Sequence, residues 1–163
     1  MSQPEAPPIR DACDADADGL ITLIGGCFAE YEGCLLDVDG ELPELRAIAT
    51  AFAGWGGRFW VAEHGERVVG CVGLSPSVDP GGVELRKLYV DRAFRRHGLG
   101  GTLTDRVEAE ARRRGAPFVD LWSDTRFETA HRFYARRGYV DGGLTRDLQD
   151  RSASVERYFR KAL

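Results

Sequence analysis

The spacing of apolar residues predicts a short strand and two helices in the first third of the chain. Residues 9–13 have the composition of a short strand. After a run of aspartates, which suits a helix N-terminus, apolar side chains recur at helical intervals at Leu20, Leu23, Ile24, Cys27 and Phe28. Residues 42–55 predict a second helix, with one apolar face made by Leu42, Leu45, Ile48, Ala49 and Phe52.

From residue 58 the pattern changes from helical to strand-like. RFWVAEH and RVVGCVGLSPSV predict a hairpin that turns at Gly65 and Glu66, and VELRKLYV at 83–90 predicts a third strand. A helix follows from Leu99, because apolar residues recur every four positions up to Ala111. The remaining segments predict a strand in 116–124, a helix ending at Gly138, and a final pair of strands.

This order of elements predicts an α/β (α+β) fold with a mixed sheet. Strand, helix and strand across residues 83–122 make a βαβ unit, whose two strands should be parallel neighbours, whereas the preceding hairpin is antiparallel. We therefore expect a mostly antiparallel central sheet of about six to seven strands, flanked by about four helices. At 163 residues the chain is long enough for one domain, expected over residues 9–163 after a flexible, proline-rich tail at 1–8.

Charge is distributed unevenly along the chain. Residues 1–85 carry 4 basic and 15 acidic residues, and residues 86–163 carry 18 basic and 11 acidic residues. One interpretation is that one side of the molecule meets an anion and the other a neutral or cationic ligand; the alternative is that these charges are solvated faces without a ligand.

Several classes of protein are not favoured by the sequence. No apolar run approaches the ~18–20 residues of a membrane helix, the N-terminus lacks the layout of a signal peptide, and the four cysteines show no metal-ligand spacing. The basic residues of the second half lack the interleaved aromatics of a base-stacking surface. We expect a cytoplasmic protein without metal, membrane or nucleic-acid partners. The sequence is compatible with a homodimer but does not determine the oligomeric state.

The turn between the strand at 83–90 and the next helix is rich in arginine and glycine. Backbone N–H groups in the first turn of a helix have no intrahelical partner, and together with the helix dipole they can bind an anion. Glycine permits a positive φ and a close approach of a ligand to the backbone. The turn alone is compatible with a simple joint or with a phosphate site, and its spacing matches neither a P-loop nor a dinucleotide fingerprint. Its residues are Arg95, Arg96, His97, Gly98, Leu99, Gly100 and Gly101.

Three stretches together resemble the GNAT family of acyl-CoA-dependent N-acetyltransferases. ELRKLYV looks like the fourth strand of that family, RRHGLG matches its pyrophosphate signature Q/R-x-x-G-x-G/A, and AHRFYARRGY looks like its later A-x-x-L/F-Y-x-x-x-G-F/Y helix. Two motifs in the right order, separated by a credible helix and strand, are more specific than either one. The helix, helix and hairpin upstream also match that fold, so the resemblance covers nearly the whole chain.

The resemblance implies a binding site for acetyl-CoA as co-substrate. In such proteins the two strands of the βαβ unit splay apart, and the pantetheine arm fills the gap beside the first strand, here at Leu88, Tyr89 and Val90. The backbone amides of the glycine turn would hold the pyrophosphate. These amides are those of Arg96, His97, Gly98, Leu99, Gly100 and Gly101, with Thr102 next in line, and the side chains of Arg95 and Arg96 would add positive charge that can pair with phosphate oxygens.

The resemblance also implies direct transfer of an acetyl group to a primary amine. Tyr134 matches the tyrosine that often acts as the general acid in this family. The alternative is that Tyr134 is a buried side chain with a role in packing only. Glu84 stands where several members of the family place a carboxylate that takes the amine proton through water. The alternative is that Glu84 is a solvated carboxylate without a catalytic role. For His97 we expect a contact with phosphate or simple exposure rather than acid–base catalysis. For His131 we expect packing on the sheet rather than a place in the active site.

The chain departs from the family pattern at Phe127, where an asparagine commonly touches the cofactor, and at Arg92, where proline is usual. The alternative function is a non-catalytic CoA-binding or regulatory domain on the same scaffold.

The acceptor side is expected in residues 30–44, with carboxylates that would attract a small cationic amine or the amine of an amino acid or peptide. A merely solubilising surface is the alternative. These carboxylates are Glu30, Glu32, Asp37, Asp39, Glu41 and Glu44.

Overall fold

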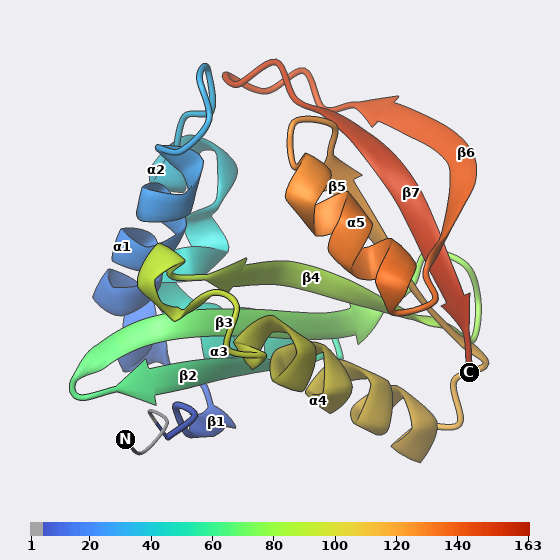
Figure 1. The fold of residues 1–163 in the computed structure, drawn as a ribbon, viewed down its shortest axis with the longest axis horizontal. Coiled ribbons are helices and arrows are strands. Elements are labelled where there is room, and N and C mark those ends of the chain that lie inside the picture. Colours follow the sequence, from blue (N-terminus) through green and yellow to red (C-terminus); the bar gives the residue numbers. More distant parts are fainter. Residues whose placement is uncertain (1–4) are drawn as a thin grey trace.

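A seven-stranded sheet runs through the computed structural model, which describes residues 5–163 (Figure 1). The strands follow the spatial order β1-β2-β3-β4-β5-β7-β6, and every neighbouring pair is antiparallel except β4 and β5. The strands are β1 (Ile9–Asp11), β2 (Arg58–His64), β3 (Arg67–Pro76), β4 (Val83–Val90), β5 (Phe118–Asp124), β6 (Val140–Asp147) and β7 (Val155–Ala162). The predicted mixed sheet with one parallel pair is confirmed.

The described residues form five α-helices, which cover the two faces of the sheet. They are α1 (Ala17–Phe28), α2 (Val38–Glu41), α3 (Ile48–Gly54), α4 (Leu99–Arg113) and α5 (Glu128–Arg136). Helices α1 and α3 pack on one face, and α4 and α5 pack on the other. Short 3-10 helices occupy Asp14–Asp16, Pro43–Ala47 and Arg92–Phe94.

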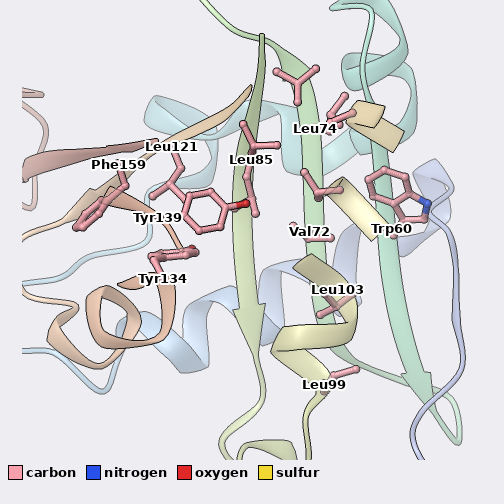
Figure 2. Close-up of a cluster of buried hydrophobic side chains, with 14 of the residues drawn as sticks. Trp60, Val72, Leu74, Leu85, Leu99, Leu103, Leu121, Tyr134, Tyr139 and Phe159 are labelled. Atoms are coloured by element: carbon pink, nitrogen blue, oxygen red, sulfur yellow. The ribbon is translucent and has the colours of Figure 1, made fainter. Parts of the chain in front are cut away.

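Strand alternation divides the core into two clusters. On β2, Trp60 and Ala62 belong to the cluster under α4 and α5, whereas Phe59 and Val61 belong to the cluster under α1 and α3. Figure 2 shows the first cluster, in which Leu103 of α4 lies beside β3 and the ring of Tyr139 lies between Leu85 and Leu121. Each face of the sheet is therefore closed by its own set of helices.

Strands β4 and β5 pair only briefly. Their register consists of Val83 opposite Val119 and Glu84 opposite Asp120, and beyond these residues the two strands separate. Strand β4 also carries a bulge against β3, where the pairing shifts and Lys87 adopts a positive φ of 54°. The structure thus contains the splayed βαβ unit that the family resemblance implied.

One predicted helix is interrupted. Residues 42–55 form a 3-10 helix over Pro43–Ala47 and then α3, so the prediction of one continuous helix there was wrong. In a continuous helix the amide of Thr50 would donate to residue 46, but here it donates to the carboxylate of Asp14 at 2.9 Å. Before it, the acidic segment expected on the acceptor side contains the short helix α2.

The beginning of the chain meets the sheet just before β1. The carbonyl of Pro8 accepts a hydrogen bond from the amide of Glu63, at 3.0 Å. Residues 1–4 of the predicted tail lie outside the described residues, and the domain boundaries stay a prediction.

Leu103→Ala should lower the free energy of unfolding by about 2–5 kcal/mol, because the substitution leaves a cavity under a fully buried side chain. Urea unfolding followed by circular dichroism would measure the loss. Leu144→Ala, at a position that is 56% exposed, is the matched control and should change stability by less than about 0.5 kcal/mol. A change at Leu103 no larger than the control would contradict the assignment of this side chain to the core.

Glu110 should make stability depend on pH. Its side chain is 4% exposed and contacts Arg113, Arg114 and Arg58, with hydrogen bonds from Arg113 lowering its pKa to about 2. A carboxylate with a lowered folded pKa stabilises the fold above its unfolded pKa of about 4.5, and this contribution is lost as pH falls towards about 2. Glu110→Gln should therefore lower the free energy of unfolding by on the order of 1–3 kcal/mol at neutral pH, and the difference should shrink in acid. Urea unfolding at several pH values would measure it, and a difference that does not change with pH would contradict the lowered pKa of Glu110.

Candidate functional site

A cavity of about 440 Å³ opens where β4 and β5 separate, on the face covered by α1. Its floor includes Glu84 and Arg86 of β4 and Trp122 of β5, and its walls come from residues 34–44 and from the loop between β6 and β7. The two walls touch each other, because the hydroxyl of Ser152 accepts from the amide of Leu35 at 2.8 Å and donates to its carbonyl at 3.2 Å. Figure 1 shows these two loops approaching each other above the sheet. The volume is in the range of small-molecule sites.

The edge of β4 presents backbone groups to the gap. The amide of Asp91 donates to Val69 of β3, and Tyr89 lies opposite Cys71. Because backbone groups alternate along an antiparallel strand, the N–H groups of Leu88 and Val90 point away from β3. Their neighbour on that side, β5, is no longer paired. The arrangement suits an extended ligand that adds to the strand edge.

The glycine turn leads into α4 as a helix N-terminus with free donors. Gly98 has a φ of 80° at the N-cap position, a conformation that favours glycine. The first helical hydrogen bond runs from the amide of Thr102 to the carbonyl of Gly98 at 3.0 Å. The amides of Leu99, Gly100 and Gly101 precede it and therefore have no helical acceptor. The hydroxyl of Thr102 also donates to Gly98, so this residue caps the turn from within.

The basic residues of the turn have different environments. Arg95 donates to both carboxylate oxygens of Glu30, at 2.7 and 2.6 Å, and to the carbonyl of Val90, so its guanidinium ties the turn to the end of α1. Arg96 adopts a positive φ of 68°, and its side chain and that of His97 are exposed. The two exposed side chains are placed beside the free amides of α4.

Glu84 lies in the cavity without a neutralising partner. Its carboxylate forms neither an ion pair nor a hydrogen bond with any of residues 5–163, although Glu84 lies opposite Asp120 on β5. Burial raises the pKa of Glu84; the charges of Asp120 and Glu156 act in the same direction, and those of Arg86 and Arg146 oppose it. A carboxyl in this setting can take up a proton at a higher pH than an exposed one.

Tyr134 belongs to α5, on the other face of the sheet. Its ring contacts Phe133, Tyr139 and Phe159 in the core cluster, and Figure 2 shows it beside Tyr139. Burial alone raises the pKa of its hydroxyl, which has no hydrogen-bond partner among the described side chains. It is not one of the residues that line the cavity. A phenol in such a site stays protonated at neutral pH and can donate.

The carboxylates expected to make the acceptor side acidic are largely matched by bases. Glu44 pairs with Lys87 at 2.8 Å in a nearly buried ion pair, and Asp37 lies 3.5 Å from Arg151. Asp39 pairs with Arg46 and Glu30 with Arg95, outside the cavity lining. The cavity is therefore less anionic than the count of acidic residues indicated.

Two cavity-lining arginines did not emerge as site residues from the sequence. Arg86 stacks on Trp55, with the guanidinium carbon 4.9 Å from the ring centre, and Arg146 stacks on Trp122 at 4.3 Å while pairing with Glu156. Strand alternation would have placed Arg86 on the same face as Glu84, since they are two positions apart. For Arg146 no local signal existed, because its strand comes from far along the chain.

The structure also shows where three further aromatic and histidine side chains lie. Phe127, where asparagine is common, lines the cavity and stacks on Tyr31 with ring centres 4.7 Å apart. Trp60 lies in the core and does not line the cavity. His131 packs on Phe159, with its Nε2 3.2 Å from the hydroxyl of Ser123, so the packing prediction is confirmed.

Residues 5–163 hold no cluster of three or more histidine, cysteine or carboxylate side chains that could bind a metal ion. Within the same residues, each helix is too short or too polar to span a bilayer.

Several relatives are similar in sequence to this protein over nearly all of its length. The amino-acid acetyltransferases of Pseudomonas putida and Azotobacter vinelandii are 31% identical to it over 162 residues, which is 99% of this chain. The chain spans only 34% of the length of those proteins.

Solved structures share the fold. An acetyltransferase of the GNAT family from Staphylococcus aureus Mu50 superposes with a TM-score of 0.81 at 24% identity, covering 97% of this chain and 99% of that one. A protein from Salmonella typhimurium, solved with its cofactor acetyl-CoA, superposes with a TM-score of 0.71 at 20% identity, covering 96% and 94% of the two chains. The family model described as "Acetyltransferase (GNAT) family" matches residues 26–139. Together with the splayed strands and the glycine turn, this match shows that the chain belongs to the GNAT acetyltransferase family.

Proposed function

We propose that this protein is an acetyl-CoA-dependent N-acetyltransferase that transfers an acetyl group directly to a primary amine in a ternary complex. The observation that carries the proposal is that β4 serves both halves of the site: its unpaired edge leads towards the free amides of α4, and its Glu84 lies in a partly polar cavity. The acceptor would be a small cationic amine or the amine of an amino acid or peptide. Relatives named amino-acid acetyltransferases support this range.

The residues present fit acetyl-CoA. The free amides of Leu99, Gly100 and Gly101, with those of Arg96, His97 and Gly98 beside them, would bind the pyrophosphate. The guanidinium of Arg96 would add charge, whereas Arg95 would act by holding the turn through Glu30. The N–H groups of Leu88 and Val90 would pair with the pantetheine arm, with Tyr89 between them. When bound, acetyl-CoA supplies an activated acyl group as a thioester.

The chain's own residues would handle two protons. The amine must lose a proton before it can attack, and Glu84 is the cavity carboxylate with no ion pair or hydrogen bond among the described residues, so it would accept that proton directly or through water. The leaving thiolate must be protonated or stabilised, and Tyr134 holds a protonated hydroxyl with no partner of its own. Nucleophilic catalysis by an enzyme residue is not required by this scheme.

A non-catalytic CoA-binding domain is the rival. The two proposed proton-transfer groups favour catalysis, and thiol release from acetyl-CoA with a panel of primary amines would separate the two functions. Binding of CoA with turnover of no amine would support the binding domain. The cytoplasmic location and the homodimer stay predictions from the sequence.

Tyr134→Phe should reduce kcat by about 100- to 10,000-fold, because the substitution removes only the proposed donor hydroxyl. The dissociation constant for CoA, measured by calorimetry, should stay within about two-fold. Tyr139→Phe is the matched control, since its hydroxyl is buried without a partner and is assigned no role. Unchanged turnover in Tyr134→Phe would remove the general-acid assignment.

The pH profile should report Glu84. A general base works only when deprotonated, so kcat/KM should fall as pH drops through the pKa of this group, which burial raises above that of an ordinary carboxyl. Glu84→Gln should lower kcat/KM by about 100-fold or more and abolish that limb of the profile. Glu66→Gln, on the exposed hairpin turn, should reproduce the original profile. An acid limb that persists in Glu84→Gln would assign it to another group.

A further inference from the structure

The lining charges of the cavity fall into matched pairs, with one cation left over. Three basic side chains line it, and two of them are engaged: Lys87 by Glu44 at 2.8 Å and Arg146 by Glu156 at 2.7 Å. Arg86 has no carboxylate partner within ion-pair distance among residues 5–163. A cation in a partly buried cavity without a counter-charge is a binding element for an anion.

Arg86 is held in place by aromatic rings. Its guanidinium carbon lies 4.9 Å from the ring centre of Trp55 and 5.7 Å from that of Phe52. Stacking fixes the plane of a guanidinium but uses none of its N–H donors. The donors of Arg86 are therefore positioned and free, and a carboxylate is the planar group that they match.

Glu84 is the complementary unpaired charge. The other carboxylates of the lining are in ion pairs or accept backbone amides, as Glu41 does from Arg151 and Asp150 from Ser154. Glu84 and Arg86 are two positions apart on β4, so their side chains leave the same face of the strand about 6.7 Å apart at Cα. They do not pair with each other, although the charge of Arg86 reaches Glu84.

We propose that the acceptor is a free α-amino acid whose α-carboxylate binds Arg86 while its α-amino group faces Glu84. This inference rests on the proposed function and narrows its acceptor to a zwitterion. A free α-amino acid carries an ammonium and a carboxylate on one carbon. Strand β4 offers an unpaired carboxylate, Glu84, for the ammonium and an unpaired guanidinium, Arg86, for the carboxylate. The side chain of the amino acid would point into the rest of the cavity.

The alternatives within the same site fit less well. A polyamine or other simple cation would bring a second positive charge to the unpaired guanidinium of Arg86. The N-terminal residue of a peptide has a neutral amide where the carboxylate would be, so its binding would leave the guanidinium of Arg86 without a counter-charge. The matched pairs on the walls also remove much of the field that would have favoured a cation.

The test compares each of the twenty L-amino acids with its own C-terminal amide as acceptor, with acetyl-CoA at saturation and thiol release as the readout. At least one free acid should be acetylated with a kcat/KM roughly 10- to 100-fold above that of its amide, because a charge-assisted hydrogen-bond pair to the carboxylate is lost. An amide used as well as its acid, for every acid that is turned over, would overturn the inference.

Arg86→Met tests the residue itself, since methionine keeps an apolar stem against Trp55 without the charge. The variant should lose the preference for acid over amide through a higher KM for the acid, with the KM for acetyl-CoA unchanged. Arg86→Lys should recover part of the preference. Arg112→Met, on the exposed last turn of α4, is the matched control and should behave as the unsubstituted protein. Retention of the full preference in Arg86→Met would contradict the assignment.

Calorimetry on the protein saturated with CoA separates this inference from the proposed function. The amino acid preferred in the acceptor panel is the titrant, or each of the twenty in turn if none is acetylated. Binding that weakens by roughly 10- to 100-fold in Arg86→Met would support the carboxylate site even if no amine were acetylated, in which case only the catalytic proposal would fail. Turnover of amines that carry no carboxylate, with equal binding by the protein and Arg86→Met, would support catalysis and overturn the zwitterion site.

Discussion

The brief pairing of β4 with β5 is the constraint on which the site depends. Two residue pairs join these strands at Val83 and Glu84, after which β4 pairs with β3 alone among the strands of residues 5–163. Buried or half-buried backbone donors left unpaired are costly unless something satisfies them. On the core side, Leu85, Leu121 and Tyr139 belong to one buried cluster, and Figure 2 shows the ring of Tyr139 between the two leucines. Beyond Glu84 the edge of β4 is therefore free of β5 and open to a ligand.

The bulge in β4 extends this effect to the side chains. Lys87 holds a positive φ that is unfavourable for a residue with a Cβ, and its nearly buried ion pair with Glu44 helps to hold that conformation. The pairing connects β4 to the 3-10 helix Pro43–Ala47, so the strand that would meet the cofactor also contacts the wall of the acceptor cavity. One local distortion therefore joins the two halves of the site.

Local patterns predicted much of the fold because most elements have one clear period. The hairpin at Gly65, the helix from Leu99 and the parallel pair were all readable from the sequence. The helix expected over residues 42–55 failed because Asp14, far away in sequence, supplies the acceptor for Thr50 and allows the backbone to break at Ala47. No window of the local sequence contains that interaction.

The candidate site was predictable to the extent that its chemistry follows the order of the chain. The glycine turn, the strand before it and Tyr134 lie in motifs whose spacing is local, so the sequence by itself determined a helix N-terminus with free amides and its place after β4. Only the tertiary structure decided which charges neutralise each other, because Lys87 meets Glu44 and Arg146 meets Glu156 across different elements. Counting acidic residues indicated a cation site, whereas the folded arrangement leaves Arg86 and Glu84 unpaired side by side. Net charge is a property of composition, but the field in a cavity depends on distances that folding alone sets.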